Sequence, residues 1–110
     1  MPEKSPASIA RLNDMLRTKG IGGEIYATPG VINLSHSMRA RVLKAITQFS
    51  EFSENNDPYN EHDFGKVEVE GESFFFKIDA YDLNLQFASD NPLDPAKTRR
   101  VMTIMRAEEY

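Results

Sequence analysis

A short polar segment between residues 55 and 65 holds the side chains best suited to chemistry. Five of them lie close together in the run NDPYNEHDFG: Asp57, Tyr59, Glu61, His62 and Asp63. Carboxylate oxygens suit Ca²⁺, Mg²⁺ or Mn²⁺, and a neighbouring histidine can act as a metal ligand or a general base. The spacing matches no standard calcium loop, because an EF-hand needs alternating acidic positions, a central glycine and a terminal glutamate. We therefore expect no resident cofactor or metal, with Ca²⁺ or Mg²⁺ as the alternative.

Turn chemistry accounts for the same segment without a ligand. Asp57-Pro58 favours a turn in which the Asp57 carboxylate accepts hydrogen bonds from backbone N–H groups. We expect the rings of Tyr59, His62 and Phe64 to pack beneath this turn. A single histidine beside carboxylates is more often structural than catalytic. No other catalytic signature is present in the sequence, neither a phosphate loop nor a cysteine nucleophile nor a nucleophile elbow. The alternative is an enzyme that uses four of these residues: Asp57, Glu61, His62 and Asp63.

Further charged residues belong to the same expected binding surface. Asp79 and Asp82 follow in the segment FFFKIDAYD, and Arg99 and Arg100 come shortly before the end of the chain. The carboxylates of the 55–65 segment repel one another if they are held close without a cation. The sequence therefore predicts that one of the two arginines reaches these carboxylates and orders the segment against the sheet, near Asp79 and Tyr81.

The elements that position these residues follow from hydrophobic periodicity. Ser8 is the expected cap of a first helix with apolar residues at positions 9, 12, 15 and 16, and residues 24–34 suggest a strand broken by a turn at residues 28–30. Ser35 precedes the clearest helix, and alternation from residue 64 predicts a hairpin and then a third strand over residues 81–87. Asp94-Pro95 is the expected start of a last helix. The predicted order is α-β-α-β-β-β-α.

This order predicts one α+β domain over residues 8–110, preceded by a flexible leader over residues 1–7. The economical architecture is a mainly antiparallel sheet with helices packed on one face, although chain order leaves the pairing of the first strand open. The length of 110 residues suits one hydrophobic core. We expect that core to contain nine residues: Met38, Val42, Ile46, Phe49, Phe74, Phe76, Ile78, Leu83 and Leu85.

Composition and charge indicate the cellular location and the class of partner to expect. The sequence has no cysteine and no apolar run long enough to cross a bilayer, so we expect a cytoplasmic protein that does not use a membrane. Residues 1–50 hold seven basic against three acidic side chains, whereas residues 51–110 hold six against fourteen. Such an acidic surface repels phosphates and attracts cations or basic protein patches. We therefore expect a protein partner with a basic surface and no direct nucleic-acid binding through the acidic face; the oligomeric state stays open.

Three sequence segments carry a resemblance to a known family: NDPYNEHDFG, FFFKIDAYD and TRRVMTIMRAEEY. Together they resemble the DUF3768 family of short bacterial proteins, a domain of unknown function, over residues 9–110. The chain departs from the family pattern at Asn60, where a glycine is usual, and at Ala80, where an aromatic residue is usual. The resemblance implies a bacterial origin, on a phage or plasmid among the possibilities, and it implies no established activity.

Three functions fit these observations. The first is a non-enzymatic acidic interaction protein that engages a basic protein surface, extending by analogy to an inhibitor of a nucleic-acid-binding host-defence protein. The second is a cation-dependent hydrolase that uses the loop from Asp57 to Asp63. The third is a domain with a structural calcium site in that loop.

Overall fold

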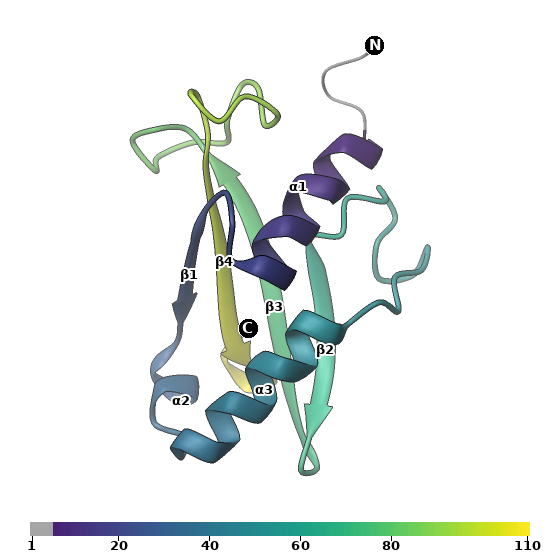
Figure 1. The fold of residues 1–110 in the computed structure, drawn as a ribbon, viewed down its shortest axis with the longest axis vertical. Helices are drawn as coiled ribbons and strands as arrows, with labels where there is room; N and C mark the ends of the chain where they lie inside the picture. The colour runs from purple at the N-terminus through teal and green to yellow at the C-terminus, as the bar shows by residue number, and fades with distance from the viewer. Residues whose placement is uncertain (1–5) are drawn as a thin grey trace.

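Four strands form one mixed sheet in the spatial order β1-β4-β3-β2 (Figure 1). The computed structural model describes residues 6–110, so residues 1–5 of the predicted leader lie outside the described part of the chain. β2 (Phe64–Val69) and β3 (Glu72–Tyr81) form the predicted antiparallel hairpin. β4 (Arg99–Arg106) pairs antiparallel with β3 and parallel with β1 (Glu24–Ala27). The predicted α+β class is confirmed.

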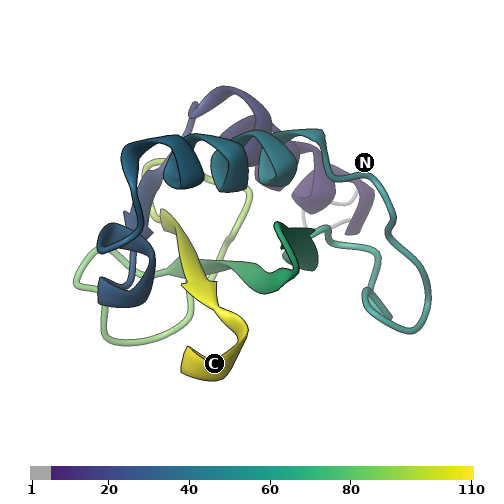
Figure 2. The same cartoon turned by 90° about the horizontal axis from the view of Figure 1, so that it is seen from below.

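Two helices cover the same face of the sheet and leave the other face without a helical layer (Figure 2). They are α1 (Pro6–Lys19) and α3 (His36–Gln48). α3 follows Ser35 as predicted, and Ser35 caps it, because its hydroxyl accepts a hydrogen bond from the Met38 N–H at 3.1 Å. α1 begins at Pro6, so Ser8 lies inside the helix and is not its cap. The helices bury their apolar sides against alternate residues of the hairpin.

The core lies between this helical layer and the sheet. Its largest fully buried side chains come from all these elements: Leu16, Val42, Ile46, Phe74, Phe76 and Met102. The alternation of β3 places Phe74, Phe76 and Ile78 on the helical side, as the sequence predicts. Met38 and Phe49 pack against this core at its margin. Most of the predicted core is therefore confirmed.

The third predicted strand and the last predicted helix are wrong. Residues 82–98 form an irregular connection in which Leu83 and Leu85 are 54% and 42% exposed, so these two residues are not in the core. The Asp82 carboxylate accepts hydrogen bonds from the N–H groups of Asn84 and Gln86, both at 3.1 Å. This local turn competes with a strand ladder. Only an isolated bridge between Tyr81 and Ala88 extends the sheet here.

The segment predicted as the last helix is the central strand β4. Its apolar residues are buried on both faces of the sheet, since Met102 and Ile104 face the helices while Val101 and Met105 face the other side. A short apolar run buried on both faces has no strict alternation and is hard to distinguish from a helix by pattern alone. The Asp94 carboxylate accepts a hydrogen bond from the Ala96 N–H at 2.9 Å. Asp94 therefore shapes a turn and does not cap a helix.

The segment predicted as one broken strand is also different beyond its turn. Strand β1 ends at Ala27, and residues after Thr28 form the short helix α2 (Pro29–Ile32). The Thr28 carbonyl accepts hydrogen bonds from the N–H groups of Val31 and Ile32. Proline at the first position favours this helical turn, because its fixed φ suits a helix start.

Arg17 ties the two long helices together and is buried, with 4% exposure. Its Nη1 donates hydrogen bonds to the carbonyls of Ile46 at 3.0 Å and Phe49 at 2.8 Å, at the C-terminal end of α3. Its Nη2 pairs with Asp14 at 2.8 Å. The guanidinium also lies over the rings of Phe52 and Phe76. Arg17 therefore supplies both the missing donor for α3 carbonyls and a charge for Asp14.

Replacing Arg17 by methionine should lower the free energy of unfolding by about 3 kcal/mol, because it removes one partner of a buried charge network. Chemical denaturation measures this change. Arg11→Met is the matched control, since Arg11 is exposed on the same helix and such surface changes stay within about 0.5 kcal/mol. Equal stability losses in the two variants would contradict the role of Arg17.

Candidate acidic cleft

The long loop between α3 and β2 is organised by one buried carboxylate. Asp57 is 5% exposed, and its Oδ1 and Oδ2 accept hydrogen bonds from the N–H groups of Glu61 at 3.0 Å and His62 at 3.1 Å. The predicted capping role of Asp57 is thus confirmed. Asn60 and His62 have φ values of 57° and 56°, which turn the chain sharply at this point. Asparagine, which stands at position 60, tolerates this conformation better than most residues do.

His62 fastens the loop to the helical layer. Its ring stacks on Phe52, with centroids 4.0 Å apart and planes 3° from parallel. The Nδ1 atom lies 3.0 Å from the Asp14 carboxylate, and Nε2 lies 3.9 Å from Oδ2 of Asp57. Asn13 adds a hydrogen bond from its amide to the Glu61 carbonyl at 2.9 Å. The predicted packing of His62 is confirmed, and α1 is the element that holds the loop in place.

The loop and the sheet enclose a hollow of about 260 Å³, which we call the acidic cleft. Three carboxylate residues line it: Glu61 and Asp63 from the loop and Asp79 from β3. The other lining residues come from α1, the end of β3, the 82–98 connection and β4: Ile9, Asn13, Ile78, Ala80, Tyr81, Ala88, Pro92 and Arg100. The Asp63 carbonyl accepts a hydrogen bond from the Ile78 N–H at 2.8 Å, which continues the ladder of the hairpin into the loop. The loop therefore lies near Asp79 and Tyr81, as predicted.

Burial sets the electrostatics of the cleft. It raises the pKa of Asp63, and the charges of Asp57 and Asp79 add to this increase. Burial likewise raises the pKa of Glu61, with further contributions from Asp63 and Asp57. Within the described residues, neither Glu61 nor Asp63 forms an ion pair, whereas Asp79 pairs with Lys77 at 3.2 Å. Two half-buried carboxylates are thus held near other negative charges without a cation of their own.

The predicted arginine partners of the loop are wrong. Arg99 pairs with Glu24 of β1 at 2.6 Å, on the face of the sheet without helices. Arg100 lines the acidic cleft, but its guanidinium donates hydrogen bonds to Oδ1 of Asn13 and to the Pro92 carbonyl, each at 2.7 Å. Burial lowers the pKa of Arg100. The reason for the difference is strand β4, which directs successive residues to opposite faces and brings Arg100 under α1.

Two of the other predicted site residues, Tyr59 and Asp82, lie away from the cleft, as does Phe64, which the sequence predicts to pack beneath the turn. Tyr59 is 76% exposed at the loop tip, so its predicted packing beneath the turn is wrong. Phe64 packs on the face without helices, against Phe75 and Tyr110. Asp82 shapes the turn that follows β3. The structure thus brings together Glu61, Asp63 and Asp79, with Asp57 and His62 holding the loop behind them.

The contribution of α1 to the site was not predicted from the sequence. Its buried face contains Ile9, Ala10, Asn13, Leu16 and Arg17, and this spacing is that of one helical side. Two polar residues on an otherwise apolar helical face signal buried hydrogen bonding, because such residues are rarely buried without partners. Asp14 lies beside this face and pairs with both Arg17 and His62.

Among residues 6–110, no group of three or more His, Asp or Glu side chains is arranged to hold a metal ion. The same part of the chain includes no helix with the length and apolar character required to cross a membrane.

A family model described as a protein of unknown function, DUF3768, matches residues 27–109. The match begins at the end of β1, so α1 lies outside it. No curated protein matched the chain, and no solved structure did.

Asp63→Asn should raise the free energy of unfolding at neutral pH, because it removes a buried charge with negative neighbours. The folded-state pKa of Asp63 lies above its ordinary value of 3.8, so the folded protein holds this proton more tightly than the unfolded chain does. The cost of the Asp63 charge therefore disappears as the pH falls through the folded-state pKa. The advantage of the variant should shrink over the same interval in thermal unfolding at several pH values.

Glu54→Gln is the control for this experiment, since Glu54 is an exposed carboxylate in the same loop. Its stability should match that of the unmodified chain at each pH. A loss of stability in Asp63→Asn at neutral pH would show that the Asp63 charge is compensated.

Proposed function

Because the chain belongs to the DUF3768 family, whose function is unknown, we propose a function from the acidic cleft itself. The protein is a non-enzymatic interaction domain that binds a basic surface of a partner protein. The cleft receives an arginine side chain from that surface.

The pair of carboxylates without a cation, Glu61 and Asp63, carries this proposal. Their raised pKa values mean that the protein pays free energy to keep them charged at neutral pH. The Asp57 carboxylate nevertheless accepts a hydrogen bond from the Glu61 N–H, and the Asn13 amide donates one to the Glu61 carbonyl, so the loop that presents them is held in place. When an opposite charge enters a preformed site of this kind, the repulsion between the carboxylates is relieved, and this relief favours binding.

The chemistry of the cleft favours a guanidinium over an ammonium group. A guanidinium presents several donors in one plane and can bind two carboxylates at once. Tyr81 is also among the lining residues, and arginine stacks on aromatic rings. Ile78 and Ala80 add apolar surface for the aliphatic part of the side chain.

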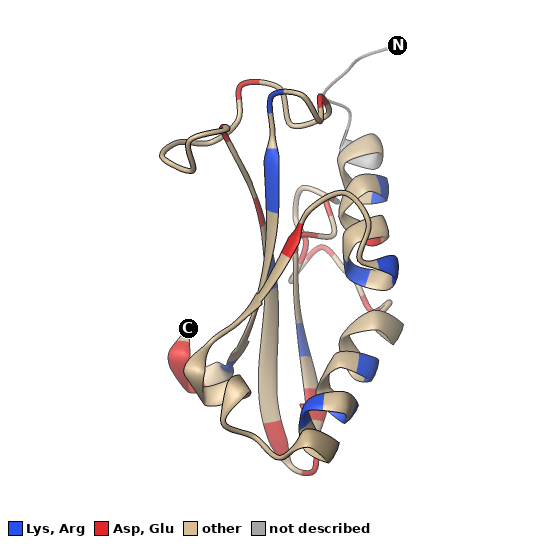
Figure 3. Ribbon diagram, turned by 60° about the vertical axis from the view of Figure 1, so that its left-hand side comes forward, with Lys and Arg blue, Asp and Glu red and all other residues tan. Residues whose placement is uncertain are grey.

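The distribution of charge supports a protein partner for this part of the molecule. Lys and Arg gather along α1 and α3, whereas most Asp and Glu lie in the loops and near the strand ends (Figure 3). Phosphates provide most non-specific affinity for nucleic acids, and the carboxylates around the cleft oppose them. A basic partner surface that binds phosphates can bind these carboxylates in their place. By analogy, we extend the proposal to nucleic-acid-binding proteins of bacterial host defence, with this chain encoded on a phage or plasmid.

Isothermal titration with a hexa-arginine peptide tests this function. The unmodified chain should bind it more tightly than hexa-lysine, and Glu61→Gln with Asp63→Asn should weaken hexa-arginine binding about tenfold or more, because two charge-assisted contacts are lost. Glu54→Gln should bind as the unmodified chain does, although it changes the net charge in the same direction.

Two results would overturn the proposal. The first is equal binding by the Glu54→Gln chain and the cleft variant, which would indicate attraction by net charge alone. The second is a rise in melting temperature with Mg²⁺ or Ca²⁺ that the cleft variant abolishes, together with no preference for hexa-arginine. That result would favour the cation-dependent hydrolase or the structural calcium site.

A further inference from the structure

Among residues 6–110, no strand pairs with the outer edge of β2. β2 pairs with β3 on one side and is the last strand in the spatial order. The hydrogen bond from the Ile78 N–H to the Asp63 carbonyl sets the pattern of this ladder. By the alternation of an antiparallel pair, residues 63, 65, 67 and 69 direct their backbone groups towards β3. Phe64, Lys66 and Glu68 therefore direct their N–H and C=O groups outwards.

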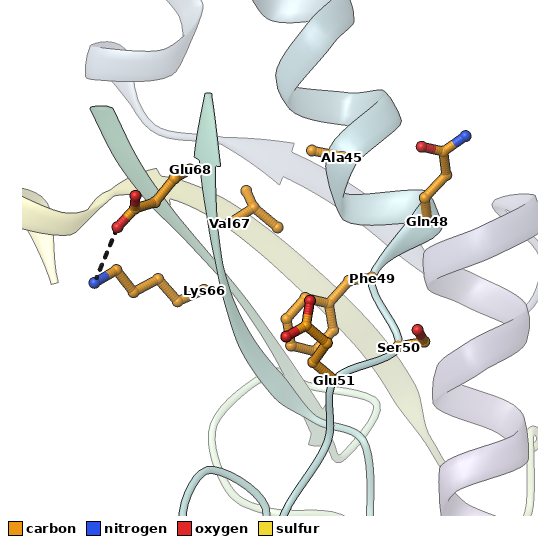
Figure 4. Close-up of a pocket in the computed structure, with 8 residues that line it drawn as sticks. All are labelled: Ala45, Gln48, Phe49, Ser50, Glu51, Lys66, Val67 and Glu68. Carbon is orange, nitrogen blue, oxygen red and sulfur yellow. Dashed lines mark ion pairs between the residues drawn. The ribbon is translucent and has the colours of Figure 1, made fainter. Parts of the chain in front are cut away.

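A hollow of about 540 Å³ runs beside this edge, between β2 and the C-terminal end of α3. Figure 4 shows Val67 on the side that faces Ala45 and Phe49, with Lys66 and Glu68 on the opposite side of the strand. Lys66 and Glu68 are exposed and lie 3.6 Å apart as an ion pair within one strand. Glu51 also lines the hollow, so the edge combines outward-directed backbone groups, an apolar margin, the opposite charges of Lys66 and Glu68, and one further carboxylate beside it.

We infer that this edge pairs with β2 of a second copy of the chain, antiparallel and about a two-fold axis at Val67. In this register Lys66 lies opposite Glu68 of the second copy, and Glu68 lies opposite its Lys66. Each of these pairs uses outward-directed backbone groups, so the two residues exchange both main-chain hydrogen bonds. The two sheets become one continuous sheet.

Charge complementarity selects a second copy as the occupant. Charged side chains at a sheet edge normally discourage pairing with another strand. An unrelated strand offers Lys66 and Glu68 no opposite charge across the new strand pair, whereas this register gives both one. The alternative symmetric register, centred on Lys66, sets the two Lys66 side chains against each other and is disfavoured. Only a sequence with the same alternation of charge fits this edge well.

The helical face of the strand is compatible with the same register. Val67 of each copy meets at the axis, and Val69 of one copy lies opposite Gly65 of the other. Gly65 has no side chain, and Phe49 lies close to it in the hollow. Val69 of the second copy can therefore cover the margin of Phe49. A closed two-fold pair also leaves no further β2 edge available for open-ended assembly.

Sedimentation velocity tests the pairing through a charge exchange. The unmodified chain should dimerise, and Lys66→Glu or Glu68→Lys alone should each raise the dimer dissociation constant about tenfold or more, because each creates like-charge pairs. The double variant should restore dimerisation to within about threefold of the unmodified chain. An equimolar mixture of the two single variants should form a heterodimer. Lys97→Glu, an exposed change in the 82–98 connection, should leave the constant unchanged.

Cross-linking measures the register separately. The chain has no cysteine, so Val67→Cys places its only thiol at the proposed axis. Non-hydrogen-bonded residues in an antiparallel pair have Cα atoms about 4.5 Å apart, within the range of a disulfide. Mild oxidation should link this variant into a covalent dimer, whereas Ser73→Cys on strand β3 should form no disulfide-linked dimer. Circular dichroism confirms that each variant is folded.

Three results would overturn the inference: a monomeric unmodified chain at millimolar concentration, dimers that persist in both single charge variants, or a double variant that fails to dimerise. None of these readouts depends on the acidic cleft, so this inference and the proposed function can fail independently.

Discussion

The buried guanidinium of Arg17 is the interaction on which the arrangement of the molecule depends. The carbonyls at the end of α3 need donors that a helix cannot supply itself, and Arg17 provides them from α1. A buried charge needs an opposite charge, and Asp14 provides it from the preceding helical turn. Because Arg17 also lies over the rings of Phe52 and Phe76, the same group joins α1, α3 and the sheet.

The same network also positions the long loop between α3 and β2. Asp14 contacts Arg17 on one side and the His62 ring on the other, so the loop is connected through one carboxylate to the helical core. The Asp57 carboxylate then determines the shape of the loop, because it accepts hydrogen bonds from two backbone N–H groups. This arrangement places Glu61 and Asp63 at a hollow instead of in open solvent. The free-energy cost of holding these two carboxylates close together is offset by the hydrogen bonds and packing of the loop outside the cleft.

The two proposed surfaces use different properties of one sheet. The acidic cleft lies where the loop, α1 and the end of β3 converge, and the selectivity that we propose for it rests on charge held in a partly buried space. The β2 edge instead offers backbone groups and an alternation of charge along a strand. A dimer through β2 would present two clefts on one continuous sheet. Two sites on one assembly bind a repetitive basic surface more tightly than one site does.

The sequence by itself determined the features that depend on neighbouring residues. These include the Ser35 cap of α3, the hairpin of β2 and β3, the capping role of Asp57 and the membership of the DUF3768 family. Such features depend on steric contacts and hydrogen bonds between neighbouring residues, so they can be predicted from a few consecutive residues.

Only the tertiary structure decided whether residues 99–106 form a helix or a strand and which groups pair with Arg99 and Arg100. The apolar spacing of this segment fits either state, and pairing with both β1 and β3 makes it a strand buried on two faces. A strand directs successive side chains to opposite faces of the sheet. Arg99 therefore pairs with Glu24 on one face, while Arg100 donates a hydrogen bond to Asn13 on the other. The partners lie more than seventy positions away along the chain, and local physical chemistry holds no information about contacts at that separation.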